Sequence, residues 1–327
     1  MSVVDMAARG VLDRLLSRRI IFVTGKGGTG KSTIAAALAL LASQSGKRVL
    51  GIDVDAKGDL SRLLGAEPAG FKPRLVQPNV SALAMRPEES LQEYLAVYFK
   101  VPRFTRLTPL ARVFDFVATG VPGTKEMLII AKIAYEERRS ESGRSAWDII
   151  IVDAAASGHV LPQLRAARSM MELTRGGIIR SQAEWVDRTL SDPRRTLLVI
   201  CALPEEMPVV EAIELHDRAN QEAHIGLGAC FLNCIFPVAV TAHQSSLLEN
   251  LVERHEQAAQ ARLGGPVQPL LDGVRLARRL HEESDRHART LRRRLSVPVV
   301  EIPRQVAATP GLAMTRAVAN ALARAAS

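Results

Sequence analysis

Residues 25–33 read Gly-Lys-Gly-Gly-Thr-Gly-Lys-Ser-Thr and come directly after the apolar run Ile-Ile-Phe-Val at residues 20–23. This fits the phosphate-binding loop pattern G-x-x-x-x-G-K-[ST], which lies between a strand and a helix. Its glycines let backbone N–H groups approach phosphates closely. The helix expected at residues 31–44, which Gly46 ends, aims its positive N-terminus at the same place. The motif therefore predicts a nucleoside triphosphate site.

The loop offers side-chain ligands as well as backbone groups. Lys31 is predicted to act as a point charge on the β- and γ-phosphates, and Ser32 is predicted to give its hydroxyl to Mg²⁺. Mg²⁺ is therefore expected together with the nucleotide. The nucleotide-binding residues expected in this segment are Gly25, Lys26, Gly27, Gly28, Thr29, Gly30, Lys31, Ser32 and Thr33.

Carboxylates end the next two predicted strands. The strand at residues 49–53 runs into Asp53 and Asp55, and either residue can orient a water or reach the magnesium shell, while the other caps the following helix. The apolar run at residues 147–153 ends in Asp153, which is expected to hold Mg²⁺ through a bound water. The small residues that follow suit a mobile switch loop, in which the N–H of Gly158 is placed to donate to the γ-phosphate.

Three further strands are expected at residues 197–200, 231–234 and 297–302. Asn233 is predicted to read the adenine edge, because its amide both donates and accepts hydrogen bonds. Pro303, at the end of the last strand, is predicted to form a wall of the base pocket. Strands and helices alternate, which favours an α/β fold with a mostly parallel sheet and helices on both faces.

Lys26 adds a feature beyond the phosphate-binding pattern. The form K-G-G-x-G-K-[ST] resembles the signature-lysine branch of P-loop NTPases, which includes MinD, ParA, the nitrogenase iron protein and the arsenite-pump ATPases. The resemblance implies that Lys26 crosses a dimer interface and neutralises charge at the partner's nucleotide during phosphoryl transfer. The alternative is a solvent-exposed loop lysine.

Several segments together resemble the arsenite-pump/guided-entry ATPase family, which delivers tail-anchored membrane proteins or drives anion pumps. The resemblance covers about residues 18–305 and is strongest to single-domain actinobacterial-type members. It gives Asp55 the place of the water-activating aspartate, although the stretch from Asp53 is also similar to the D-x-D-x-x-G of ParA. The matching segments are residues 153–161 for D-T-A-P-T-G-H-T-L, 122–126 for P-G-x-D-E and 204–212 for P-E-x-x-x-x-E-A.

The resemblance implies a dimeric switch ATPase in the cytoplasm, which hydrolyses ATP with Lys26, Lys31 and Asp55 as catalytic residues. The dimer is expected to be a homodimer or a heterodimer with a paralogous ATPase, and to handle a hydrophobic or membrane-protein client. Residues 1–327 are expected to form one P-loop ATPase domain, with a helical client or partner subdomain inserted at about 67–143. Apolar residues at helical spacing there form a client groove or ordinary core: Leu91, Leu95, Phe99, Val101, Phe104, Leu107, Leu110, Val113, Phe114 and Val117.

Charge, aromatic content and cysteine spacing bear on the alternative classes of protein. The net charge is +9, with basic residues gathered between 275 and 294, so a ParA/MinD-like positioning ATPase on DNA or membrane stays an alternative. Aromatic residues make up 4% of the chain, which makes nucleic-acid binding by stacking unlikely. The cysteines are Cys201, Cys230 and Cys234, and the last two have the wrong spacing for an arsenite site or an interface zinc. An anion-pump subunit stays a further alternative, but arsenite binding loses support, and no zinc or iron–sulfur cluster is expected. No apolar run approaches about 18 residues, so no membrane span is expected.

Overall fold

The structure is a computed structural model that describes residues 3–98, 123–237, 240–305 and 309–325. Most apolar residues expected to line the client groove, from Phe99 to Val117, lie outside these ranges, as does Pro122. The main sheet of the described residues has eight strands in the order β10-β9-β8-β1-β7-β2-β4-β3. Its strands are β1 (Ile20–Gly25), β2 (Val49–Asp53), β3 (Arg74–Gln77), β4 (Val80–Ala84), β7 (Ile149–Asp153), β8 (Thr196–Ala202), β9 (Leu227–Ile235) and β10 (Val299–Pro303).

All strand pairs in this sheet are parallel except β3 with β4 at one edge. β1 lies in the middle, between β7 and β8. Its residues are buried on both faces, as the unbroken apolar run before the phosphate loop indicates. The α/β fold with a mostly parallel sheet is therefore confirmed, and the central strand leads straight into the loop.

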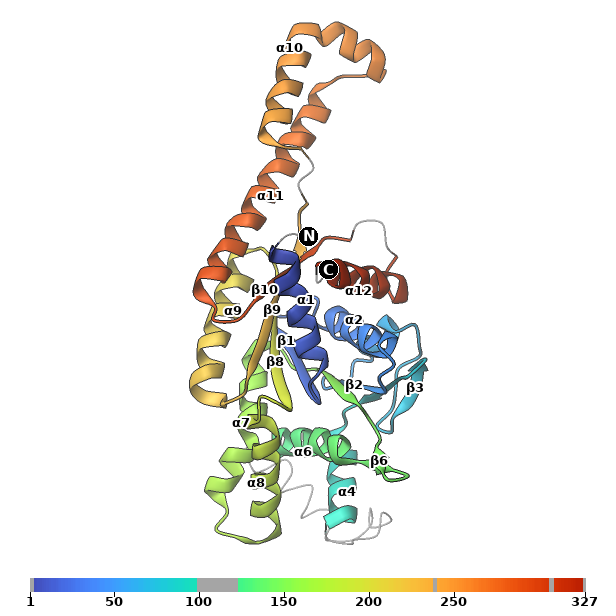
Figure 1. The fold of residues 1–327 in the computed structure, drawn as a ribbon, viewed down its shortest axis with the longest axis vertical. Coiled ribbons are helices and arrows are strands. Elements are labelled where there is room, and N and C mark those ends of the chain that lie inside the picture. Colours follow the sequence, from blue (N-terminus) through green and yellow to red (C-terminus); the bar gives the residue numbers. More distant parts are fainter. Residues whose placement is uncertain (1–2, 99–122, 238–239, 306–308, 326–327) are drawn as a thin grey trace.

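Helices cover both faces of the sheet (Figure 1). Ile21 and Val23 of β1 belong to the core on one face, with α1, α2 and α12; Ile20 and Phe22 belong to the other core, with α6, α7, α8 and α9. The helices are α1 (Val3–Leu16), α2 (Lys31–Gln44), α3 (Asp59–Leu63), α4 (Pro87–Tyr98), α6 (Thr124–Arg138), α7 (Ser157–Leu173), α8 (Gly177–Ser191), α9 (Glu206–Arg218), α10 (Ala242–Leu263), α11 (Gln268–Arg294) and α12 (Leu312–Ala325).

Two short strands, β5 (Ser140–Glu141) and β6 (Arg144–Ser145), form a separate hairpin, and a π-helical turn, η2 (Ala219–Ala223), follows α9.

The helix predicted at 31–44 is found at those residues because its alanine-rich sequence packs on all sides, against the sheet and α12. In the part of the chain that the structure describes, no helix is long and apolar enough to cross a membrane.

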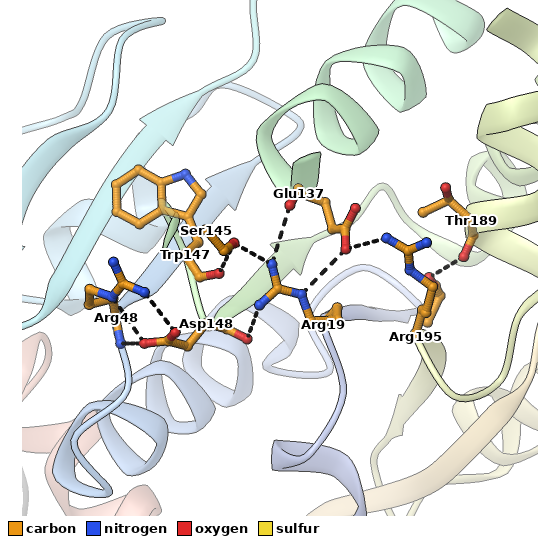
Figure 2. Close-up of polar contacts among 9 residues, drawn as sticks. Arg19, Arg48, Glu137, Ser145, Trp147, Asp148, Thr189 and Arg195 are labelled. Carbon is orange, nitrogen blue, oxygen red and sulfur yellow. Dashed lines mark hydrogen bonds and ion pairs between the residues drawn. The ribbon is translucent and has the colours of Figure 1, made fainter. Parts of the chain in front are cut away.

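A polar clasp holds α6 to the amino-terminal edge of the sheet (Figure 2). The buried Glu137 accepts hydrogen bonds from Arg19 Nε at 3.3 Å and from Arg195 Nη2 at 2.6 Å. These arginines precede β1 and β8, so one carboxylate ties two neighbouring strands to the helix layer. Beside it, Arg48 and Asp148 join the starts of β2 and β7 by a 2.9 Å ion pair.

Candidate nucleotide site

The backbone of the phosphate loop requires glycine at two positions. Gly25 ends β1 at φ +154°, where a Cβ would lie 2.1 Å from the carbonyl oxygen of Cys201. Gly30 begins α2 at φ +86°, and a Cβ there would lie 2.4 Å from Asn233 Nδ2. Because no side chain fits either place, both glycines of the motif set the loop's path between β8, β9 and α2.

Hydrogen bonds from its surroundings hold the loop in shape. Asn233 Nδ2 donates to the carbonyl oxygen of Thr29 at 3.1 Å, and Thr29 Oγ1 donates to that of Lys26 at 2.9 Å. Asn233 Oδ1 accepts from the N–H of Cys234, so both ends of this amide bind backbone groups. The predicted reading of adenine by Asn233 therefore stays a prediction, while its bracing of the loop is a role that the sequence did not suggest.

A cavity of about 460 Å³ opens beside the loop, at the carboxyl-terminal edge of the sheet. It brings together most of the predicted site: Lys31, Ser32 and the three aspartates. Six predicted residues lie outside this lining: Gly25, Lys26, Thr29, Gly158, Asn233 and Pro303. The lining residues are Gly27, Gly28, Gly30, Lys31, Ser32, Thr33, Asp53, Asp55, Lys57, Asp59, Arg62, Leu63, Asp153, Ala154 and Gly311.

Asp153 is the best candidate for a magnesium ligand in the cavity. It is 6% exposed, and within the described residues its Oδ1 has no hydrogen-bond partner. Burial raises the pKa of Asp153 to about 7, against the opposing effect of the Ser32 hydroxyl. A buried, unpaired carboxylate oxygen next to a hydroxyl fits hydrated Mg²⁺, which prefers oxygen ligands and keeps several waters.

Asp53 and Asp55 differ in their surroundings. Asp53 is 4% exposed, and its Oδ2 accepts from the N–H of Gly58 at 2.8 Å, where α3 begins. Burial raises the pKa of Asp53 above its usual value. The Asp55 side chain is 43% exposed, with Lys57 Nζ 3.9 Å away. Asp53 thus bonds to the turn that starts the next helix, whereas Asp55 has room to contact a water or a phosphate.

Lys26 turns away from the cavity toward α9. Its Nζ lies 2.6 Å from Glu211 Oε1, and Glu211 Oε2 accepts from Ser157 Oγ at 3.3 Å. Glu211 therefore connects the phosphate loop to Ser157, the first residue of α7. Ser157 belongs to the predicted switch segment. The sequence indicated Glu211 only as the last glutamate of the segment at 204–212, and nothing in the sequence indicated a site role for Lys57, Arg62 or Gly311.

The glycine cradle before α2, the cavity at the strand ends and the buried Asp153 define a nucleotide-binding α/β protein of the P-loop class. The model of the anion-transporting ATPase family, the ArsA ATPases, matches residues 18–183, and the chain belongs to this family. The match includes β1, the loop, all three aspartates and the switch segment.

Individual relatives agree with this membership. The chain is 31% identical over 220 residues to ATPase BagA of Mycobacterium tuberculosis, which covers 65% of this chain and 64% of that protein. It is 28% identical to the arsenical pump-driving ATPase of Acidiphilium multivorum, over 74% of this chain and 43% of that protein. It is 33% identical to ATPase get3 of Schizosaccharomyces japonicus, over 46% of each. The chain thus spans about half to two thirds of these relatives' lengths.

Proposed function

We propose that the protein is a Mg-ATP-dependent switch ATPase that works as a dimer, in which hydrolysis opens and closes the two subunits around a client. The observation that carries this proposal is the divergence of the two loop lysines. Lys31 lines the cavity beside Asp153, whereas Lys26 points to Glu211 on α9 and away from the cavity. A lysine aimed away from its own phosphates is available to a nucleotide on another subunit.

Within one subunit, the phosphate loop and the ends of β2 and β7 contribute different parts of the proposed site. Backbone N–H groups at Gly27, Gly28 and Gly30 bind the phosphates, and Lys31 neutralises their charge. Ser32 and Asp153 hold Mg²⁺, Asp153 through a bound water. Asp55 orients the attacking water, because Asp53 is engaged by Gly58. When bound, Mg²⁺ would supply positive charge that offsets the charge of the phosphates.

The switch segment gives hydrolysis a mechanical output. Thr24 Oγ1 donates to the carbonyl oxygen of Ala155 at 2.8 Å, and Ser157 reaches Glu211. The predicted γ-phosphate contact of Gly158, the second residue of α7, would therefore move a helix that packs on α6 and α8. Loss of the γ-phosphate would release this helix and with it the helical layer around it.

An exposed apolar turn supports a hydrophobic client. Leu173 at the end of α7 is 68% exposed, and Ile178 and Ile179 at the start of α8 are 48% and 40% exposed. The sequence prediction placed the client groove at about 67–143, of which α4 and α6 are described. The α7–α8 turn adds apolar surface to the helical layer that includes them, and we infer that both serve the client or partner.

The cysteines do not favour the anion-pump alternative. Burial raises the pKa of Cys230 to about 12 and that of Cys201 well above its usual value. Binding of a soft metalloid needs thiolates, which burial disfavours here. Four of the eight arginines at 275–294 form ion pairs, Arg275 with Glu249 and Arg289 with Asp285 among them, so only part of this basic charge is open to DNA.

Three variants test the proposed chemistry, with ATP binding and phosphate release measured side by side. Lys26→Ala is expected to lower turnover by at least about 100-fold and to keep the ATP dissociation constant within about threefold. Lys31→Ala is expected to lose both ATP binding and turnover. Asp55→Asn is expected to bind ATP without hydrolysing it. Equal loss of ATP binding in Lys26→Ala and Lys31→Ala would refute the division of roles between the two lysines.

A further inference from the structure

A helical arm projects from the body of the protein. The chain leaves the sheet after β9, and α11 meets it there: His281 Nδ1 donates to the carbonyl oxygen of Phe236 at 2.8 Å. Beyond this point α11 packs on the body, and Ser284, Ala288 and Leu291 are buried. Before it, α10 and the first half of α11 extend past the sheet and its helices (Figure 1). We call residues 242–280 the arm.

The arm has a defined internal structure. Thr241 and Gln244 form a capping box at the start of α10, and Gly264 ends the helix at φ +70°. Val252, Val267 and Leu271 form a small core between the two helices. Glu249 Oε1 accepts from Arg275 Nε at 2.9 Å across the same contact. These contacts hold α10 against α11, and α10 bends at His255, whose backbone is not helical.

That outer side carries exposed leucines. Leu247 and Leu251 lie one turn apart on α10, 54% and 59% exposed. Leu263 and Leu270 lie near the tip, and Leu276 lies on α11; these three are 46–56% exposed. Two helices that pack only on each other bury only the faces they share. Leu247 and Leu251 share one side of α10 and form the leucine face of the projecting hairpin, which we expect another molecule to cover.

Charge on the arm points to a protein as that molecule. Glu253, Arg254 and Glu256 lie two to five residues after Leu251, so acidic and basic groups both occur next to the apolar residues. Attraction to an anionic lipid surface needs an excess of lysine and arginine beside the apolar residues. Apolar residues surrounded by charges of both signs are instead typical of protein interfaces with a polar rim.

The place where the arm leaves the body points to a second copy of this chain. The arm follows β9 and begins at the carboxyl-terminal edge of the sheet, where Asn233 contacts the phosphate loop. A second copy docked at this edge would receive Lys26, so it would lie alongside the arm. The same edge carries Met207 and Val210, which are 59% and 43% exposed on α9 beside Glu211. These two residues are apolar counterparts for an arm reaching over from the other subunit.

We propose that the arm is a dimerisation element, whose leucine face packs on the α9 surface of a second copy while the two nucleotide edges meet. The inference rests on the proposed ATP-dependent dimer and assigns the surface that holds it together. In a two-fold dimer each arm reaches the other body, so one contact is made twice.

The test is sedimentation equilibrium with Mg²⁺ and a non-hydrolysable ATP analogue. Leu247→Asp combined with Leu251→Asp is expected to raise the dimer dissociation constant at least about tenfold, because charged groups replace central apolar contacts. The matched control is Leu75→Asp, which changes a leucine that is 69% exposed on β3, outside the arm. This control is expected to dimerise like the parent. Circular dichroism and unchanged analogue binding show that both variants are folded.

Two results would overturn the inference, and they are distinguishable. If the parent dimerises and the arm variant dimerises equally well, the arm assignment is wrong and the proposed dimer stands. If the parent remains monomeric with the analogue, the proposed dimer fails and the arm assignment fails with it. A photo-crosslinker at position 251 gives an independent readout: crosslinks between chains support the inference. Crosslinks within one chain only, or to phosphatidylglycerol vesicles, contradict it.

Discussion

Lys26 and Lys31 lie five residues apart in one loop and have different neighbours. Lys31 lines the cavity with Ser32 and Asp153, as its place in the motif predicts. Lys26 pairs with Glu211, 185 residues further along the chain. Local sequence was sufficient for the first lysine, because spacing alone places it at a helix N-terminus. It was insufficient for the second, because its partner comes from another element.

Removing the negative charge of Glu211 tests whether the Lys26–Glu211 ion pair keeps Lys26 on its own subunit before dimerisation. The two side chains are 35% and 27% exposed, and a pair so open to water contributes only about 0.2–1 kcal/mol. Glu211→Gln is therefore expected to strengthen ATP-dependent dimerisation by no more than about fivefold, as Lys26 is freed. Sedimentation with the ATP analogue measures this, and a loss of turnover as deep as in Lys26→Ala would show that Glu211 acts in catalysis instead.

Asp153 predicts a pH dependence of stability in the ligand-free protein. Its pKa is about 7 when folded and near 3.8 when unfolded, so the folded state favours the protonated form. The stability from this group is present below pH 4 and is lost as pH rises to 7. Asp153→Asn should match the parent near pH 4 and exceed it at pH 8 by on the order of 4 kcal/mol in the free energy of unfolding.

Urea unfolding at the two pH values, in chelator and without nucleotide, measures the difference. Adding Mg-ATP should reduce the advantage of the asparagine variant at pH 8, because the cation stabilises the aspartate. A constant gap between variant and parent at both pH values would contradict the burial of an uncompensated carboxylate.

Among the elements, strands and the helix after the loop were predictable, and contacts between distant elements were not. The expected helix at 31–44 and strand at 49–53 match α2 and β2. Periodicity and motif spacing are local properties, and they determine such elements. The projection of the α10–α11 arm could not be predicted from the sequence. A charged helix has the same sequence pattern whether it lies on the body or projects from it.

The clasp at Glu137 is the element-scale contact with the clearest energetic prediction. Its side chain is 3% exposed and is shared by Arg19 and Arg195. Glu137→Gln is expected to lower the free energy of unfolding by about 1–3 kcal/mol, because two partly exposed arginines lose charge-assisted hydrogen bonds to the buried carboxylate. Denaturant titration measures this loss.

Glu141→Gln is the matched control for Glu137→Gln. Glu141 pairs with Arg139 but its side chain is 60% exposed, so the loss is expected to stay below about 0.5 kcal/mol. A loss as small for Glu137→Gln would mean that the clasp does not secure α6 to the sheet.

At the scale of the whole molecule, the two edges of the sheet have different roles. The amino-terminal edge is fastened by paired charges, whereas the carboxyl-terminal edge carries the cavity, Lys26 and the root of the arm. The sequence predicted which residues gather at the second edge, because parallel strands end together there. We propose that each active site at this edge is completed by a lysine from the other chain.

Mixing two inactive variants tests that claim most directly. Lys26→Ala chains keep Asp55, and Asp55→Asn chains keep Lys26, so a mixed dimer contains one complete site. After equal mixing, turnover is expected to recover to about a quarter of the parental rate, since half of randomly paired dimers are mixed and one of their two sites is complete. Turnover that stays at the sum of the two variants measured alone would contradict a lysine supplied across the dimer.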